Sequence, residues 1–267
     1  MIREPRFAHD WYPGTPDRLR SALQTYVGSA LSDQPVFGVI APHAGYIYSG
    51  AVAGATYARI RVPDLAAVCC VNHRGIGPRV ALMSSGQWQT PLGLVPIRSD
   101  FCRDLLKNTP LVQEDITAHL KEHSLELQLP FLQYRNDRVC LVPICLQHLD
   151  YAECEILGEG IARTIRSSGE DVLLVASTDM THFEPEHVAR ERDDFAIRKI
   201  LDLDPRGLYE IVQEKDITMC GTVPTTVVLC ACKELGAKHA TLVRYSTSAD
   251  VTGDRSNVVG YAGILLF

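Results

Sequence analysis

Short runs of valine, isoleucine, leucine and alanine recur along this chain and alternate with stretches of helical periodicity. The runs are apolar throughout, whereas a strand with one solvent-facing side would alternate polar and apolar residues. They therefore predict strands covered on both faces, in an α/β fold built as a three-layer α/β/α sandwich around a mixed, mostly buried sheet. The expected strands are 36–41, 66–72, 139–144, 171–176, 239–245 and 257–266, and the expected helices are 50–60, 99–107, 120–134, 151–167, 187–202 and 222–235.

Two shorter strand-like segments, 79–84 and 93–98, flank a turn that contains Trp88 and Pro91. They fall outside the alternation of strands and helices, so we expect a sheet that is not purely parallel. A chain of 267 residues can bury one large core or two modest ones. Because no repeat, low-complexity segment or linker divides it, we predict one domain over residues 1–267.

The charge pattern argues against nucleic acid and membranes as partners. The formal net charge is −6, and no block of consecutive Lys or Arg forms the footprint that a phosphate backbone requires. No apolar run approaches the length of a membrane span, and the N-terminal MIREPRFAHDWYPG lacks the apolar core of a signal peptide. We therefore expect a cytoplasmic protein that binds neither nucleic acid nor membrane.

The nine cysteines are an odd number, and most of them stand inside apolar segments such as AAVCCV and VVLCAC. Buried free thiols that behave as small hydrophobic side chains account for these residues. Cys220 differs because it comes just before the expected helix 222–235, in which Thr222 is a candidate N-cap. The positive end of the helix dipole favours thiolate there, the form that binds metals. The alternative is that Cys220 is only a small residue at a tight turn.

Histidines follow three of the expected strands at the point where each strand ends. His43 follows 36–41, His73 follows 66–72, and Asp179 with His182 follows 171–176. Because the carboxyl ends of strands in such a sheet converge on one edge, these side chains are expected to meet there. Neutral imidazole is the commonest metal ligand and the usual acid or base near neutral pH. Singly, each is more simply a loop residue, but together they predict a metal site with an attendant proton donor.

The segment KEHSLELQLPFLQY, residues 121–134, brings acidic groups to the same region. Read as a helix, it places Glu122 and Glu126 on one face with His123 beside them. These residues form either a solvated acidic face or a wall of the site that orients the metal-bound histidines. Tyr46, in APHAGYIYSG, either adds a hydroxyl to the pocket or packs in the core.

Five motifs in the same order along the chain resemble those of the Memo family. They are APHAGYIYSG, EHSLELQLPFLQY, STDMTHFE, CGTVPTTVVL and YSTSADVTGDRSNVVGYAGILL, and the similarity runs from FAHDWYP to the last expected strand. The resemblance implies a fold shared with the class III extradiol dioxygenases, the LigB-like enzymes. Bacterial and archaeal members of the family are often encoded beside an AMMECR1-type protein and a radical SAM enzyme, so these two proteins are expected partners.

The resemblance also implies a metal site. In the animal Memo protein two histidines and a cysteine bind an ion described as iron or copper, and the matching residues here are His43, His73 and Cys220. Asp179 and His182, in STDMTH, match the acid and base positions. Iron is therefore the expected ion, with copper or zinc as alternatives.

The chain departs from the family pattern at two places. Arg74 follows His73 where the family has a second histidine. His9-Asp10 stands before Trp11, where the family commonly has Ala-Gly, so the pocket wall that carries Trp11 is expected to differ.

Three functions compete. The first is a metal-dependent redox reaction like that of the dioxygenases, although a thiolate donor shifts metal preference toward copper(I) or zinc. The second is a non-catalytic accessory protein that binds a small molecule or peptide and acts with a radical SAM partner. The third is a zinc hydrolase, with His182 or Glu122 as the base.

Overall fold

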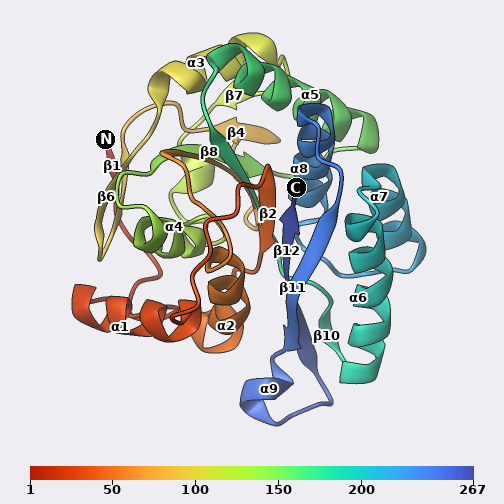
Figure 1. The fold of residues 1–267 in the computed structure, drawn as a ribbon. Coiled ribbons are helices and arrows are strands. Elements are labelled where there is room, and N and C mark those ends of the chain that lie inside the picture. The colour runs from red at the N-terminus through yellow and green to blue at the C-terminus, as the bar shows by residue number, and fades with distance from the viewer.

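The computed structural model describes residues 1–267 and has a nine-stranded mixed sheet at its centre (Figure 1). Eight of the nine strands lie in a linear order, and the ninth, β11 (Ala240–Thr247), pairs with β12 outside that order. That order is β10 (His182–Glu184), β12 (Val258–Leu266), β2 (Gly38–Ala41), β9 (Val172–Ser177), β3 (Leu65–Val71), β8 (Cys140–Leu146), β4 (Val80–Leu82) and β7 (Gln113–Glu114).

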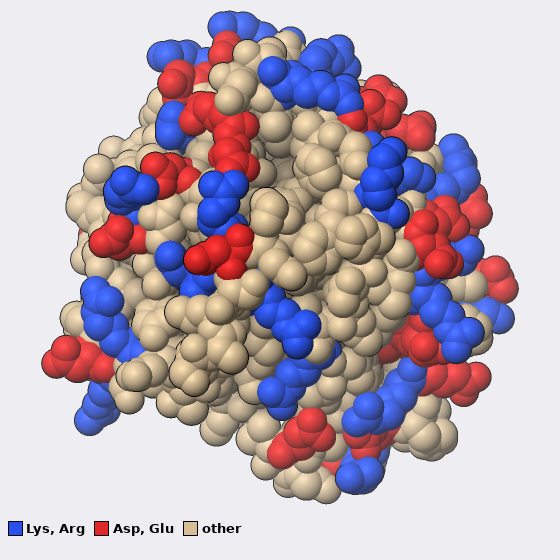
Figure 2. Space-filling model, viewed as in Figure 1, with Lys and Arg blue, Asp and Glu red and all other residues tan.

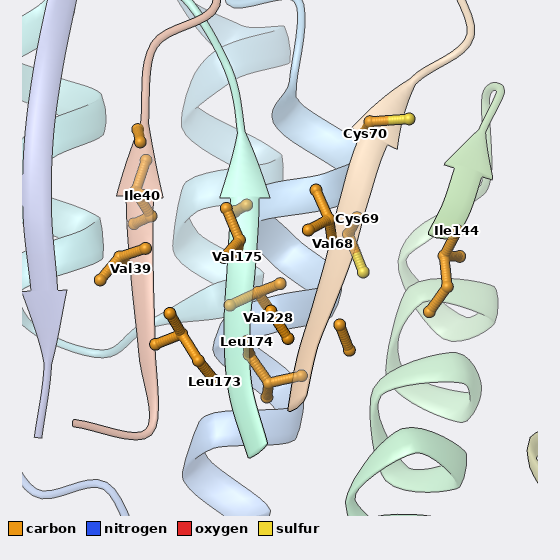
Figure 3. Close-up of a cluster of buried hydrophobic side chains, with 14 of the residues drawn as sticks. Val39, Ile40, Val68, Cys69, Cys70, Ile144, Leu173, Leu174, Val175 and Val228 are labelled. Carbon is orange, nitrogen blue, oxygen red and sulfur yellow. The ribbon is translucent and has the colours of Figure 1, made fainter. Parts of the chain in front are cut away.

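Four parallel strands, β2, β9, β3 and β8, form the middle of this sheet, and the arrows of β2, β9 and β3 point the same way in Figure 3. Every residue of β2 and β9 is buried, and both sequences are apolar up to Ser177 at the end of β9, as expected of strands packed on both faces. Ala41 of β2 lies opposite Ser177 of β9. The loops after these two strands therefore leave the sheet at the same level.

Helices cover both faces of the sheet and make the three-layer α/β/α sandwich (Figure 1). On one face lie α1 (Pro16–Val27), α2 (Tyr46–Tyr57) and α4 (Leu129–Arg135). The other face carries α3 (Ser99–Asn108), α5 (Tyr151–Ser168), α6 (Glu186–Leu201), α7 (Pro205–Glu214) and α8 (Thr222–Leu235). Val228 of α8 lies behind the central strands in Figure 3, among the buried apolar side chains.

A small three-stranded sheet lies outside the large one and holds the N-terminus. Its strands are β1 (Ile2–Arg3), β5 (Gln87–Thr90) and β6 (Gly93–Pro96). The remaining regular elements are the short helix α9 (Ala249–Thr252) and the 3₁₀ turns η1 (Thr117–His119) and η2 (Glu126–Gln128). A single cluster of 73 buried residues forms the main hydrophobic core.

The predicted α/β class and mixed sheet are confirmed, but one predicted helix is wrong. Residues 120–125 of the expected helix 120–134 form turns, because the carboxylate of Glu122 accepts the backbone N–H groups of His123 and Ser124. A side chain that caps its own backbone in this way competes with helical hydrogen bonds. Glu122 and Glu126 therefore do not share a helical face. Helices α1 and α7 were not predicted.

Charged side chains of both signs are intermingled on the face shown in Figure 2, without an extended patch of one sign. None of the helices combines the length and the apolar character that crossing a bilayer would take.

Candidate functional site

His43 stands just beyond β2, and its ring is oriented by a chain of buried hydrogen bonds. Its Nδ1 lies 2.9 Å from Ser177 Oγ, and its backbone N–H donates to Asp179 Oδ1 at 2.8 Å. The one hydroxyl proton of Ser177 goes to the Ser124 carbonyl at 2.6 Å, and Gln128 Nε2 donates to the same hydroxyl at 2.8 Å. His43 must therefore carry its proton on Nδ1, which leaves a lone pair on Nε2.

His73 is oriented in the same way by Glu122. The Glu122 carboxylate accepts from both the backbone N–H and Nδ1 of His73 at 2.9 Å. Burial alone would raise the pKa of Glu122, but its hydrogen bond to His73 and the nearby His123 lower that pKa to about 2. Because a carboxylate only accepts, His73 also carries its proton on Nδ1 and keeps Nε2 free.

His123 completes a group of three imidazoles. Its ring stacks on that of His73, with centroids 4.5 Å apart, and its Nδ1 lies 3.2 Å from Glu122 Oε1. One ring nitrogen of each of His43, His73 and His123 lies within 4.8 Å of the other two. Burial lowers the pKa of His123 to about 4 and holds that of His43 well below its usual value, so both rings are neutral at pH 7. Three convergent imidazoles of this kind could hold a divalent metal ion.

Cys220 touches this group without being a member of it. Its Sγ lies 3.4 Å from His43 Nε2, and the backbone N–H of Asp179 donates to it at 3.3 Å. The N-cap of α8 is Gly221 and not Thr222, so the thiol does precede a helix. Burial, together with Asp179, nevertheless raises the pKa of Cys220 to about 12. The prediction that Cys220 is a thiolate is therefore wrong for the protein without a metal ion, in which the thiol keeps its proton. A metal ion coordinated by the sulfur would remove that proton.

Asp179 and His182 flank the imidazole group. Burial raises the pKa of Asp179 to about 6, against the lowering effect of its bond to the His43 amide. His182 donates its backbone N–H to Thr218 Oγ1 at 2.7 Å, and its Nδ1 lies 2.8 Å from the Thr218 carbonyl. Since a carbonyl only accepts, the proton is on Nδ1 and Nε2 is free to exchange a proton with a bound molecule.

These side chains stand at one large cavity of about 750 Å³, a volume suited to a small organic molecule. His43, His73, His123, Asp179 and His182 all line it. Its remaining walls come from the N-terminal segment, the start of α2, and the segments around β10 and α9, which lie at the lower end of the sheet in Figure 1. Cys220 instead lines a separate cavity of about 340 Å³ that shares no lining residue with the first.

The sequence matches the model of the family described as Memo-like protein over residues 3–265. The chain belongs to the Memo family. It is 39% identical to a MEMO1 family protein of Methanothermobacter thermautotrophicus over 98% of this chain and 99% of that protein. A MEMO1 family protein of Methanopyrus kandleri is also 39% identical, over 99% of both chains.

Among solved structures, an uncharacterized protein, JW3007, from Escherichia coli K12 superposes with a TM-score of 0.57. The match covers 85% of this chain and 98% of the other at 15% sequence identity. At that identity the likeness concerns the fold alone.

Three other residues were expected in the pocket of this Memo-family protein, and only one of them lines the cavity. Trp11 lines the cavity, and the centroids of its ring and of the His123 ring are 4.5 Å apart. Tyr46 does not line the cavity: it is buried and donates its hydroxyl to the Leu127 carbonyl at 2.7 Å. Glu126 is fully buried away from the cavity and forms an ion pair with Arg3.

Sequence reasoning missed several side chains that shape this Memo-family site. Ser177, Gln128 and Thr218 orient the histidines, yet nothing in their local sequence distinguishes them from ordinary buried polar residues. Phe183 stands at the cavity with 74% of its surface exposed. Its position directly after His182, in STDMTHFE, is the one signal that could have identified it.

Proposed function

We propose that this Memo-family protein binds a divalent metal ion, iron first, and catalyses a metal-dependent redox reaction on an organic molecule held in the cavity. His43 and His73 are the first two donors, and Cys220 is the third. His123 is close enough to add to this set or to take the place of the thiol. The observation that carries the proposal is the convergence of three imidazole nitrogens within 4.8 Å of one another.

The orientation of the rings supports a metal over a purely structural cluster. Buried histidines in a core donate one ring N–H and satisfy the other nitrogen with a donor. Here Ser177 and Glu122 occupy the Nδ1 atoms of His43 and His73, which leaves the Nε2 of His73 to the site and the Nε2 of His43 facing the Cys220 sulfur at 3.4 Å, the atom proposed as the third donor. Acceptors that fix the tautomer of an imidazole in this way are typical of metal ligands.

A bound divalent ion would supply a Lewis acid with open coordination positions, and iron would add redox chemistry. The chain itself supplies proton transfer. His182 Nε2 can accept a proton from the bound molecule, since Nδ1 is held by the Thr218 carbonyl. Asp179, whose pKa burial raises to about 6, can donate or accept a proton near neutral pH.

The first test is the metal content of protein purified without oxygen from cells supplied with iron, copper and zinc. We expect about one ion per chain, lost in His43→Ala and retained in the control His187→Ala, which removes an exposed histidine of α6. Comparing Cys220→Ser with His123→Gln then identifies the third donor. A wild-type protein that comes out metal-free refutes the proposal.

The second test separates catalysis from binding. Oxygen consumption with a panel of catechols and small reductants should fall in His182→Ala, while metal content stays unchanged. Equal rates in wild type and variant would exclude His182 as the proton-transfer residue, and a wild-type rate no higher than that of buffer would exclude the redox role. The better proposal would then be an accessory protein that binds a small molecule or peptide beside an AMMECR1-type or radical SAM partner.

A further inference from the structure

The charge of the cavity walls limits what the cavity can hold. Its 18 lining residues include three carboxylates, Asp10, Asp179 and Asp254, and no Lys or Arg. Asp10 and Asp254 are exposed to solvent, whereas Asp179 lies deep beside the imidazole group. An anionic substituent outside the metal centre would therefore meet carboxylates and no compensating cation.

The two arginines nearest in sequence to the cavity direct their guanidinium groups to partners outside its lining, although the charge of Arg74 adds to the effect of burial in lowering the pKa of His123. Arg74 follows His73, and its Nε donates to the Lys121 carbonyl at 2.6 Å. Arg255 follows Asp254, and its guanidinium lies 3.1 Å from a carboxylate oxygen of Glu186. Neither lines the cavity, so the acidic residues of the wall are not neutralised from within it.

The same cavity has an apolar rim. Ile47, Tyr48 and Phe183 line it and are 65%, 40% and 74% exposed. Large apolar side chains that gather at the edge of a polar pocket are typical of a binding surface, because exposing them gives no stability.

Phe183 is held on this rim by a strained backbone. Its φ is +60°, a conformation that bulky residues rarely adopt. It is the extra residue of a bulge in β10, where His182 pairs with Val259 and Glu184 pairs with Val258. The bulge turns the aromatic ring out of the strand beside His182, with ring centroids 5.7 Å apart. Strain at a residue whose side chain is not packed points to a role in binding.

We propose that the molecule bound in this cavity is neutral or cationic and apolar where it meets the rim, and that Phe183 is its main contact there. This inference rests on the proposed function in one respect: a polar group of the bound molecule must reach the group of three imidazoles formed by His43, His73 and His123. An aromatic face can contact an apolar group or a cation, and the carboxylates of Asp10 and Asp254 favour the cation further. Negatively charged molecules, including phosphorylated ones, are disfavoured.

Three catechols with the same ring and different tails test the charge preference. Dopamine has a cationic tail, 4-methylcatechol a neutral one and 3,4-dihydroxyphenylacetate an anionic one. Calorimetry at low salt should show dopamine binding about tenfold more tightly than the anionic compound, with 4-methylcatechol between them. In Asp10→Asn/Asp254→Asn this ratio should fall to about threefold or less. Binding of the anion as tight as that of dopamine, or no binding of any of the three, overturns the inference.

Phe183→Gly tests the rim contact, because it should weaken ligand binding without lowering the stability of the fold. Glycine adopts positive φ freely, so the thermal midpoint should be unchanged or higher. The affinity for all three catechols should nevertheless fall about tenfold. Ile156→Ala, which removes an exposed apolar side chain from α5, should leave affinity unchanged. Unchanged affinity in Phe183→Gly overturns the assignment of Phe183.

The metal content of each sample is measured alongside binding, so the two proposals fail separately. A metal-free protein that still ranks the catechols by tail charge contradicts the proposed function and supports this inference. A metal-loaded protein that binds the three catechols equally tightly, whatever the charge of their tails, supports the proposed function and contradicts this inference.

Discussion

The buried ion pair between Arg3 and Glu126 should be worth far more to the fold than any ion pair on the surface. The two side chains are 1% and 0% exposed. Glu126 Oε1 also accepts from the Phe7 backbone N–H at 2.9 Å and from the Tyr12 hydroxyl at 2.7 Å. This carboxylate therefore ties strand β1 and the segment that carries Trp11 to the rest of the protein.

The effect of breaking this pair follows from its burial. Arg3→Met leaves the Glu126 carboxylate without a cation and removes guanidinium bonds to the carbonyls of His119 and Glu122, at 3.1 and 2.8 Å. An uncompensated buried charge costs about 3–5 kcal/mol. In a chain of this size that corresponds to a fall in thermal midpoint of roughly 10 °C.

A double-mutant cycle isolates the contribution of the pair. Glu126→Gln alone leaves the buried guanidinium of Arg3 without an anion, whereas Arg3→Met/Glu126→Gln removes both charges together. Urea unfolding of metal-free protein should therefore show the double variant about 2 kcal/mol more stable than the sum of the singles predicts. The matched control is the exposed pair of Arg61 and Asp171, with side chains 53% and 55% exposed. The double-mutant cycle of this surface pair should give a coupling energy of less than about 1 kcal/mol.

Additive effects at Arg3 and Glu126, within about 0.5 kcal/mol, would refute this reasoning. So would a coupling energy no larger than that of the surface control.

Other expectations concern Glu122 and Gly54. Glu122→Gln should weaken metal binding about 10–100-fold in competition with a chromogenic chelator, because His73 loses the carboxylate that fixes its ring; unchanged affinity would contradict this role. The folded protein lowers the Glu122 pKa from 4.5 to about 2, so its stabilisation is complete above about pH 4.5 and is lost as the pH falls toward 2. In metal-free protein, the gap in unfolding free energy between wild type and Glu122→Gln should shrink over that window, and a gap independent of pH would argue against it. A Cβ on Gly54 of α2 would collide with the Tyr26 backbone of α1, so Gly54→Ala should destabilise the protein by about 1–3 kcal/mol in urea unfolding, although alanine is the better helix former. A variant as stable as wild type would count against that close packing.

The sequence predicted the central architecture because one physical rule governs it. Strands buried on both faces are expected to be apolar, and β2, β3 and β9 follow that rule except for Ser177 at the last position of β9. The convergence of His43 and His73 follows from the same rule, since both stand just beyond the ends of parallel strands.

The failures of prediction come from long-range hydrogen bonds. Glu122 and Glu126 have helical spacing, but one carboxylate binds His73 and the other binds Arg3. Neither partner is near in sequence, so periodicity could not reveal them. Cys220 likewise has the local sequence of an activated thiol, and only the folded chain shows that burial outweighs the helix dipole and raises its pKa to about 12.

The register of β2 and β9 has a consequence for the order of events in the cell. Ala41 lies opposite Ser177, so His43 and Asp179 come together only when strands more than a hundred residues apart have paired. Cys220 and the last wall of the cavity, Tyr261, arrive later still during synthesis. An ion held by His43, His73 and Cys220 could be captured only after synthesis has passed Cys220 and these strands have paired, so its uptake would report that this part of the fold has formed.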